Sequence, residues 1–592
     1  MQSIIPRDVL QRLERTERTV CVVDASRSPQ LDPAHQASRR LRVGVLVSVG
    51  KLPAWMLTVL ERINESPSLE LVLIRVESER ARQTSASWRY FILNLWKRFD
   101  SISFAKENTA LRLADTPHEL NHVNTLHIAP GLLSDTDLER LKAAQLDVIL
   151  SLDQDDLIPR LLDTAEHGVW SLCDGHENAT AENALWDIVE RRDVSPAAIV
   201  RHTRTGSEVV YHSVFACDPR SLARHRNRVC SRWPTFVHQA LLNYSSATPK
   251  QVRGVKSVAP EMAVQRGLPG NLQMLTFLVC QFGDGLLRKI RRSVFQEQWL
   301  IGIRHRRTGN DAFRLGAFNL ISAPPGHFYA DPFVFETEGE QYLFFEDYVR
   351  GQSKGVIACI QIDDSGFVGE PKVVLETDYH LSNPTIFRWE GQSYMLPETR
   401  DSGRISLFRA VDFPWRWEFD RVLIDSVWAV DPTLFEHAGK FWMFAGGVER
   451  NGLIDGELFL FFSDSPFGPW VGHPRNPVVA DARRARPAGQ VFTLQGQLVR
   501  PGQDCARRYG RAVVLNRIEV LSETQYRESP FLTLGSDWFP GNIGTHVLNQ
   551  SANYQVVDGR FYSPKYSAGG SFVCFWNRIL PSSSCFKVPR RA

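Results

Sequence analysis

Acidic and amide side chains recur at one position of a repeated unit in the second half of the chain. Asp331, Asn383 and Asp431 each precede a proline, and each begins a segment with Phe four residues later and Gly four residues after that. A fourth such segment begins at Ala488, and the four starts are 52, 48 and 57 residues apart. Buried carboxylates that crowd together have raised pKa values, which suits proton transfer or the chemistry of glycosidic bonds.

Other polar residues occupy fixed places within or beside the same unit. Its last position carries Glu346, Glu398, Gly446 and Gln503. Arginine guanidinium groups beside the fourth unit match the oxyanions of a phosphate or a uronate. The candidate catalytic residues are Asp331, Asp431 and Glu398. The candidate substrate-binding residues are Glu346, His380, Asn383, Arg486, Arg500, Gln503, Asp504 and Arg507.

The same residues also have a purely structural interpretation. Asp-Pro at the start of a strand often caps a turn, and arginine–carboxylate pairs can tie neighbouring sheets together. Both interpretations stay open from the residues alone. We expect no metal site, because the scattered cysteines form no zinc pattern.

The elements that would position these residues are the blades of a β-propeller. From about Trp299 the apolar pattern has period two, and a strand, a glycine turn and a second strand recur near every 50 residues. A fifth unit would begin near Gly544 and include a turn at Asp558-Gly559. Five blades would bring the equivalent positions of the repeat together around one axis. A β-sandwich of meanders is the alternative.

The first half predicts a different fold. Strand patterns at 41–49, 69–76, 124–129 and 147–152 alternate with helical patterns, which indicates βαβ units and a Rossmann-like α/β domain. The first strand is not followed by G-x-G-x-x-G, so we expect no dinucleotide and no cofactor. The predicted divisions are a flexible extension (1–38), the α/β domain (39–250), a helical connector (251–297) and the propeller (298–592).

Composition limits the partners of the protein. Lys plus Arg number 69 and Asp plus Glu 66, which gives a net charge of +3 and no support for nucleic-acid binding. The nine cysteines are scattered and contain no C-x-x-C. No signal peptide or membrane span is recognisable, so we expect a cytoplasmic protein. The connector has a helical apolar pattern and a basic end at 288–292, typical of an interdomain helix or of a peripheral contact with the inner membrane. The oligomeric state stays open.

The propeller segment resembles the arabinanase/levansucrase/invertase superfamily, especially family 43 glycosidases. The runs 330–335 and 430–435 carry this resemblance. It implies that Asp331 is a general base and that Asp431 orients it and tunes the pKa of the acid. The general acid of that family is a Glu in a Glu-Gly-Pro motif, whereas the aligned stretch here reads Arg486-Pro-Ala-Gly-Gln. Ordinary hydrolysis, which needs both groups, is therefore not expected. Glu398 could substitute from a different place in the repeat.

The first half resembles the formyltransferase fold at 147–152, 168–172 and 194–202. That family uses an Asn-x-His pair and a later Asp, and here neither Asn nor His is in register. His176 would be a displaced catalytic group or an ordinary loop histidine.

Both halves together resemble bacterial proteins that carry a domain similar to the amino-terminal part of plant glucosamine inositolphosphorylceramide transferase. Phrases such as 464–470, 473–478 and 503–510 carry this resemblance. It implies a sugar, nucleotide-sugar or glycolipid as the partner. Three hypotheses follow: a glycosyl transferase-like enzyme of surface-polysaccharide or glycolipid biosynthesis, a non-catalytic glycan-binding scaffold, and a sugar formyltransferase.

Overall fold

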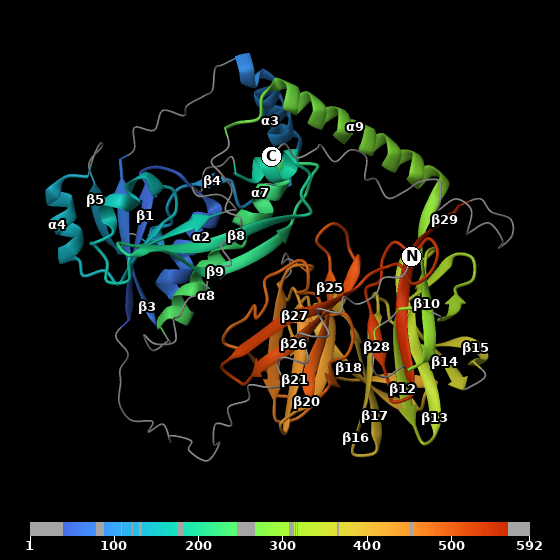
Figure 1. Ribbon diagram of the computed structural model, residues 1–592. Helices are drawn as coiled ribbons and strands as arrows, with labels where there is room; N and C mark the ends of the chain where they lie inside the picture. The colour runs from blue at the N-terminus through green and yellow to red at the C-terminus, as the bar shows by residue number, and fades with distance from the viewer. Residues whose placement is uncertain are drawn as a thin grey trace. The chain divides into compact units, whose positions relative to one another are not determined.

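The computed structural model describes residues 40–77, 88–107, 109–120, 122–128, 133–173, 183–245, 267–306, 313, 315–316, 318–363, 366–449 and 454–565 (Figure 1). The predicted extension (1–38), His176 and most of the first part of the connector lie outside these ranges. Across the part of the chain that is described, no helix is both long enough and apolar enough to span a membrane.

A seven-stranded mixed sheet forms the first domain, in the order β5-β3-β1-β6-β7-β8-β9. The first five of these strands in space run parallel, and β8 and β9 are antiparallel to their neighbours. The predicted alternation of strands and helices is confirmed, since apolar strands are separated by amphipathic helices. The strands are β1 (Leu41–Ser48), β3 (Leu69–Val76), β5 (Asn124–Ile128), β6 (Val148–Ser151), β7 (Val169–Cys173), β8 (Val194–Thr203) and β9 (Gly206–Ala216), with a small pair β2 (Leu52–Pro53) and β4 (Leu113–Ala114).

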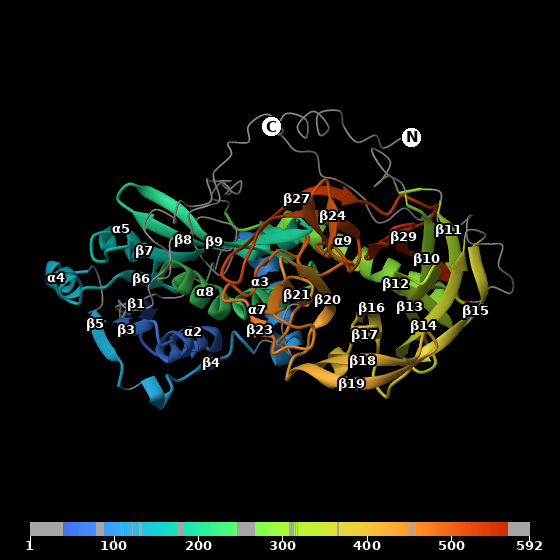
Figure 2. The ribbon, with the colours of Figure 1, turned by 90° about the horizontal axis from the view of Figure 1, so that it is seen from below.

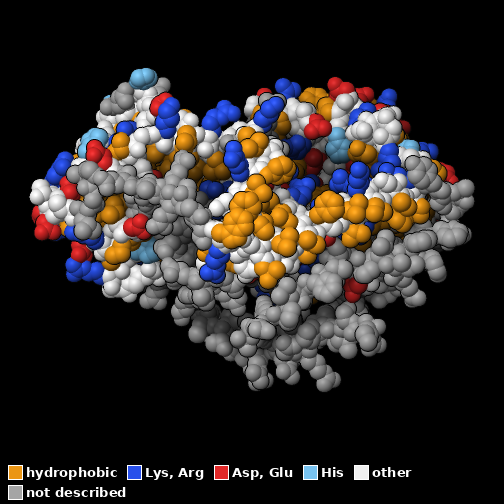
Figure 3. All heavy atoms as spheres, turned by 90° about the horizontal axis from the view of Figure 1, so that it is seen from above, with side chains coloured by type: hydrophobic (Ala, Val, Ile, Leu, Met, Phe, Trp, Pro, Cys, Tyr) orange, Lys and Arg blue, Asp and Glu red, His pale blue; other side chains and the backbone are white. Residues whose placement is uncertain are grey.

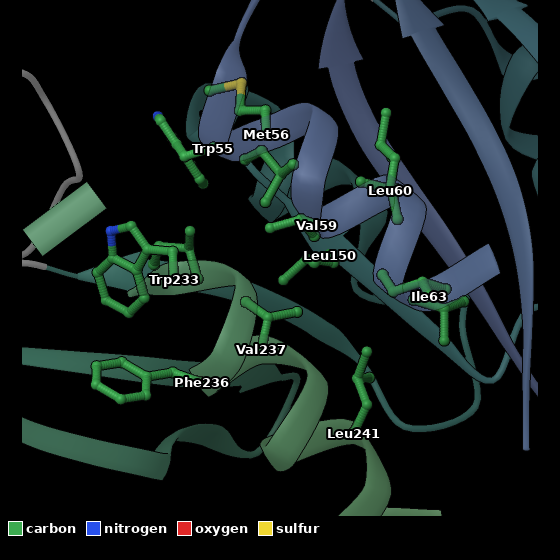
Figure 4. Packing of buried hydrophobic residues seen from close by; sticks show 14 of the residues in the cluster. Trp55, Met56, Val59, Leu60, Ile63, Leu150, Trp233, Phe236, Val237 and Leu241 are labelled. Carbon is green, nitrogen blue, oxygen red and sulfur yellow. The ribbon is translucent and has the colours of Figure 1, made fainter. Parts of the chain in front are cut away.

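Helices α2 (Ala54–Glu65) and α8 (Trp233–Ser245) pack their apolar sides against the sheet and against each other. Figure 4 shows Trp55, Val59 and Ile63 of α2 facing Val237 and Leu241 of α8. The remaining helices are α3 (Phe91–Ser103), α4 (Asp135–Ala143), α5 (Ile158–Leu161), α6 (Asn183–Val189) and α7 (Leu222–Cys230). Ser134 caps the N-terminus of α4, and its side chain forms a capping box with Asp137.

The helical pattern of the connector forms one long helix, α9 (Asn271–Val294), which leads directly into β10 (Phe295–His305). Strand β10 pairs along its whole length with the last strand of the propeller. The propeller therefore includes residues before Trp299, because its closing sheet takes strands from both ends of this half of the chain.

Five four-stranded antiparallel sheets make up the propeller and surround one axis (Figure 2). In chain order the first four are β12–β15, β16–β19, β20–β23 and β24–β27, and the fifth has the order β11-β10-β29-β28. The strands are β11 (Asn319–Ser322), β12 (His327–Thr337), β13 (Glu340–Val349), β14 (Lys354–Asp363), β15 (Gly366–Leu375), β16 (Ser382–Trp389), β17 (Gln392–Glu398), β18 (Arg404–Asp412), β19 (Arg416–Asp425), β20 (Val430–His437), β21 (Lys440–Gly446), β22 (Leu458–Ser463), β23 (Val471–Gly472), β24 (Phe492–Leu494), β25 (Gln497–Asp504), β26 (Ala512–Leu521), β27 (Tyr526–Leu534), β28 (Leu548–Gln550) and β29 (Tyr554–Pro564).

The recurring glycine makes the same tight turn in four blades. Gly339, Gly391, Gly439 and Gly496 have φ values of 83°, 81°, 74° and 77°, and the residue before each also has a positive φ. Two successive positive φ values in a two-residue loop are the hairpin turn whose twist matches the flanking strands. The predicted turn is confirmed in all four blades.

The predicted turn at Asp558-Gly559 is wrong. Both residues lie inside β29, where Asp558 pairs with Ile301 and Gly559 with Leu300 of β10. Gly559 is needed there for space rather than for a turn, because a Cβ at this position would lie 2.4 Å from a ring carbon of Phe539.

Candidate functional site

The three residues that precede proline adopt the same unusual backbone conformation. Asp331, Asn383 and Asp431 have φ values of 51°, 42° and 48°, and a register shift interrupts each first strand at this point. A left-handed conformation at a residue other than glycine costs on the order of 1–3 kcal/mol, so the surrounding structure must hold it in place. All three are at most 5% exposed, and the backbone N–H of Asn383 donates to Asp331 Oδ2 at 3.1 Å.

Two glutamates at the ends of second strands complete an acid cluster. Glu346 and Glu398 are each 6% exposed, and Glu398 Oε2 accepts the backbone N–H of Asp431 at 3.0 Å. Burial raises the pKa of Glu398 to about 8, and the neighbouring Asp431 adds to the effect. Burial and the charge of Asp331 raise the pKa of Glu346 well above its usual range. Glu398 therefore favours the protonated form near neutral pH.

A histidine that the sequence did not single out lies between two of the aspartates. His546 Nε2 is 2.9 Å from Asp331 Oδ1, and its Nδ1 is 2.6 Å from Asp558 Oδ2. Burial alone would lower the pKa of His546, but Asp558 and Asp331 outweigh it and raise the pKa to about 10. For Asp331, burial alone would raise the pKa, and the imidazolium of His546 reverses this and lowers it. Asp331 therefore favours the carboxylate form, in contrast to Glu398.

Asp331, His546 and Asp558 also offer ligand atoms within 4.8 Å of one another, which is close enough for a metal ion. A metal-binding imidazole must be neutral and needs a free nitrogen lone pair. Because the two aspartates favour a doubly protonated imidazole, the chemistry of the trio fits an ion-paired chain rather than a metal site.

The third aspartate has its own cation. Arg486 Nε donates to Asp431 Oδ2 at 2.6 Å, and a second guanidinium nitrogen of Arg486 donates to Asp455 at 3.1 Å. Gln503 Nε2 also donates to Asp431 Oδ2 at 3.2 Å. Burial raises the pKa of Asp431, and Arg486 opposes this effect. Arg486 thus places a positive charge among the acids of the cluster, and its guanidinium already binds the carboxylates of Asp431 and Asp455.

Asn383 differs from the other buried groups of this cluster, because its side-chain nitrogen has neither a hydrogen bond nor an ion pair. Asn383 Nδ2 has no hydrogen-bond acceptor, although the residue is 5% exposed. An unsatisfied buried donor costs about 1–3 kcal/mol, and such groups in proteins usually meet a ligand or an ordered water. Nearby, His380 accepts the N–H of Gly355 on Nδ1, and its Nε2 is 3.7 Å from Glu346 Oε1. Burial lowers the pKa of His380, so this imidazole is neutral.

Aromatic rings border the same cluster. The ring of Trp299 lies 4.3 Å from that of His546, and the ring of Tyr509 lies 5.2 Å from it. The guanidinium of Arg486 also contacts the Tyr509 ring, at 4.8 Å. Tyr509 is 36% exposed, in contrast to the acids Asp331, Asp431, Glu346 and Glu398.

Three predicted binding residues lie elsewhere. Arg500 is 1% exposed and pairs with Glu528 at 2.7 Å, so it joins strands inside blade four. Asp504 accepts the N–H of Ala506 at 3.0 Å. Arg507 is half exposed and lies 3.7 Å from Asp193. The structure thus brings together Asp331, Asn383, Asp431, Glu346, Glu398, His380, Arg486 and Gln503, and adds His546 and Asp558.

Two cavities in the described part of the chain are lined by residues other than the acids of the cluster. One of about 250 Å³ is lined by residues such as His212, Arg475 and Asp481. The other, of about 200 Å³, is lined by Asp455, which pairs with Arg486. The acids of the cluster line neither cavity. The chemistry, and not the volume of these cavities, is what singles out the cluster.

Comparison with known families gives a match inside the propeller. Residues 317–535 match the family described as glucosamine inositolphosphorylceramide transferase 1, N-terminal. The chain is 37% identical over 213 residues to glucosamine inositolphosphorylceramide transferase 1 of Oryza sativa subsp. japonica. It is 36% identical over 215 residues to the protein of that name from Arabidopsis thaliana. Each match covers 35% of this chain and only 28% of the relative.

Solved structures with some similarity include an α-L-arabinanase of Cellvibrio cellulosa in complex with arabinohexaose. It has 16% sequence identity and a TM-score of 0.26, and the match covers 34% of this chain and 77% of the arabinanase. A β-xylosidase/α-arabinofuranosidase from a compost microbial metagenome has 13% identity and a TM-score of 0.30, covering 41% of this chain and 93% of that one.

Proposed function

We propose that the propeller binds a sugar at the acid cluster and acts as a glycosyl transferase-like component of glycolipid or surface-polysaccharide biosynthesis. The observation that carries this proposal is the unsatisfied amide of Asn383 within a cluster of acids in opposite protonation states. The names of the plant relatives support a glycolipid context.

The charges of the cluster indicate which sugars would fit. Two cations in the cluster are already paired with its aspartates. Arg486 pairs with Asp431, and His546 pairs with Asp331 and Asp558. An anionic uronate or phosphate would meet carboxylates here rather than a free guanidinium. A neutral sugar or an amino sugar suits this environment better, because its hydroxyl or ammonium groups can donate to the acids.

The acids could share the work of a transfer reaction. Asp331, which stays ionised, would accept a hydrogen bond from the acceptor hydroxyl and later its proton. Glu398, protonated below about pH 8, would donate a proton to the leaving group. The exposed ring of Tyr509 would stack on a sugar face. The base-like role of Asp331 and the modulating role of Asp431 agree with what the glycosidase resemblance implies.

We propose that the first domain has a formyltransferase-like fold without the Asn-x-His pair of that family. We propose that the protein is located in the cytoplasm.

A non-catalytic glycan-binding role is the second candidate. The observation that favours it is Arg486, which stands where family 43 glycosidases have their general acid.

The test compares binding of glucosamine, glucose and glucuronate to the full chain by saturation-transfer NMR and calorimetry. Asp331→Asn and Glu398→Gln are compared with Glu436→Gln, which changes an exposed carboxylate on β20. We expect glucosamine or glucose to bind and Asp331→Asn to weaken that binding at least about tenfold, the effect of one lost charge-assisted hydrogen bond. Binding that is unchanged in Asp331→Asn, or preferred for glucuronate, would refute the proposal.

Turnover of a nucleotide-sugar donor separates the two candidates. A transferase that needs protonated Glu398 should lose kcat as the pH rises through about 8, and Glu398→Gln should abolish this dependence. Sugar binding with no turnover of any donor would favour the glycan-binding role.

A further inference from the structure

Helices α3 and α9 carry more than half of the exposed large hydrophobic side chains in the described part of the chain. We define the α3–α9 face by these residues, which project to solvent from the two helices and from the turn before α3. They are Trp88, Phe91, Leu95, Phe99, Ile102, Leu272, Leu275, Val279, Phe282, Leu286, Leu287, Ile290 and Val294, with exposures from 46% to 77%.

These side chains follow the helical repeat and form one stripe on each helix. On α9 they recur at spacings of three and four residues along the whole helix, as in Leu275, Val279, Phe282 and Leu286. Figure 3 shows the apolar side chains as a band across this side of the molecule, with Lys and Arg beside it. An exposed apolar patch of this extent usually marks an interaction surface.

The opposite sides of the two helices are already occupied. Trp96 of α3 meets Phe277 of α9 edge-on at 5.3 Å, and Met274 belongs to the same buried cluster. The side chain of Asn271 also donates to the backbone of Trp88 and accepts from that of Ile92. Contacts between their inner sides thus hold the two helices together. The side chains of the α3–α9 face remain exposed.

Charge on these helices is strongly asymmetric. Their basic residues are Lys97, Arg98, Arg288, Lys289, Arg291 and Arg292. Their two acids are both engaged: Asp100 is 3% exposed and accepts the N–H of Ala223, and Asp284 pairs with Arg191. The α3–α9 face is therefore apolar with a basic border and with no free acid on α3 or α9.

We propose that the α3–α9 face docks on the surface of an anionic phospholipid bilayer, with both helices parallel to the membrane plane. Apolar side chains would enter the acyl boundary, and the basic residues would lie at the level of the phosphates. Because Met274 and Phe277 hold the other side of α9 in the protein core, the helix would lie on the bilayer rather than cross it. A second copy of the chain fits less well, since it would bring two basic borders together without compensating acids.

The test is flotation of the full chain with phosphatidylcholine vesicles, with and without phosphatidylglycerol. We expect binding to the anionic vesicles that weakens as salt rises, because charges contribute alongside apolar burial. Phe99→Asp and Phe282→Asp should each weaken binding at least about tenfold, since each removes a large apolar group from the interface. Both side chains are at least 69% exposed, so these changes should leave the fold intact.

Phe419→Asp is the matched control, because this ring is 57% exposed but lies on β19 of the propeller. Its vesicle binding should equal that of the unchanged protein. Lys289→Glu with Arg292→Glu should remove the preference for anionic lipid. No binding to anionic vesicles, or binding that Phe99→Asp and Phe282→Asp leave intact, would overturn the proposal. Dimers in light scattering that dissociate in the same two variants would also overturn it, in favour of a second copy. The proposal does not rest on the sugar-binding function, and vesicle binding is measured without any sugar.

Discussion

Replacing His546 with glutamine removes a buried positive charge that lies between two carboxylates. Its imidazole is 2.9 Å from Asp331 and 2.6 Å from Asp558, and the side chain is 3% exposed. The pKa of His546 rises from 6.5 to about 10 in the folded protein. This difference corresponds to roughly 4–5 kcal/mol, since one pKa unit equals about 1.4 kcal/mol. Breaking a buried ion pair typically costs about 3–5 kcal/mol, which agrees with this figure. We therefore expect His546→Gln to lower the free energy of unfolding by several kcal/mol.

The pH dependence gives this prediction a distinctive sign. Below pH 6.5 the imidazole is protonated in both the folded and the unfolded chain, so its full contribution to stability is present. Between 6.5 and about 10 the unfolded chain releases the proton while the folded protein keeps it, and the free energy of unfolding falls with rising pH. One proton accounts for a slope of about 1.4 kcal/mol per pH unit. Urea unfolding followed by fluorescence between pH 8 and 9.5 should show this slope, and His546→Gln should lack it.

His473→Gln is the matched control for a buried histidine. His473 is also 3% exposed, but burial lowers its pKa to about 4, so it is neutral in the folded protein throughout this window. Its replacement should leave the slope between pH 8 and 9.5 unchanged. An equal slope in His546→Gln and the unchanged protein, or an imidazole of His546 that titrates near 6.5 by NMR, would refute the ion-paired assignment.

Further predictions concern the packing around the same blades. Arg500→Met should cost about 3 kcal/mol in urea unfolding, because it removes two guanidinium hydrogen bonds from the buried Glu528 and leaves it only that of Arg484. Arg404→Met, which breaks an exposed pair on β18, should cost no more than about 1 kcal/mol, and equal losses would contradict the structural role of Arg500. Gly355→Ala should lower stability by about 1–3 kcal/mol, because its Cβ would lie 2.5 Å from a backbone oxygen. Gly351→Ala, which meets nothing within 4 Å, should be nearly neutral in thermal unfolding; a similar loss in both would refute the packing argument.

The parts of the fold with a local physical cause could be predicted from the sequence. The hairpin glycines were recognisable because a two-residue turn with two positive φ values favours glycine at a fixed distance from each strand. Asp331, Asn383 and Asp431 were recognisable as one set because each stands before proline at the same place in the repeat. Their left-handed φ and the interrupted register could not be read from the sequence, although they orient the side chains.

Residues whose role depends on distant partners were missed or misplaced. His546 and Asp558 belong to the least regular unit, and the fifth sheet is closed by β10 from the other end of the propeller, so the repeat gave no alignment for them. Arg500 was grouped with Arg486 because both flank the fourth repeat. Only the fold separates them, since one contacts Asp431 and the other contacts Glu528.

The position of Arg486 has a chemical consequence for the whole cluster. A glutamate at this place would add a buried charge beside Asp431, whereas the guanidinium cancels one. The remaining acids then divide into an ionised Asp331, held by His546, and a Glu398 whose pKa of about 8 keeps it protonated near neutrality. A proton acceptor and a proton donor are thus both present in the cluster. Because the two lie in different blades, the order of proton transfers in the proposed reaction would depend on which bond of a bound sugar reaches each carboxyl. This geometry would then determine whether the proposed site transfers a sugar or only holds it.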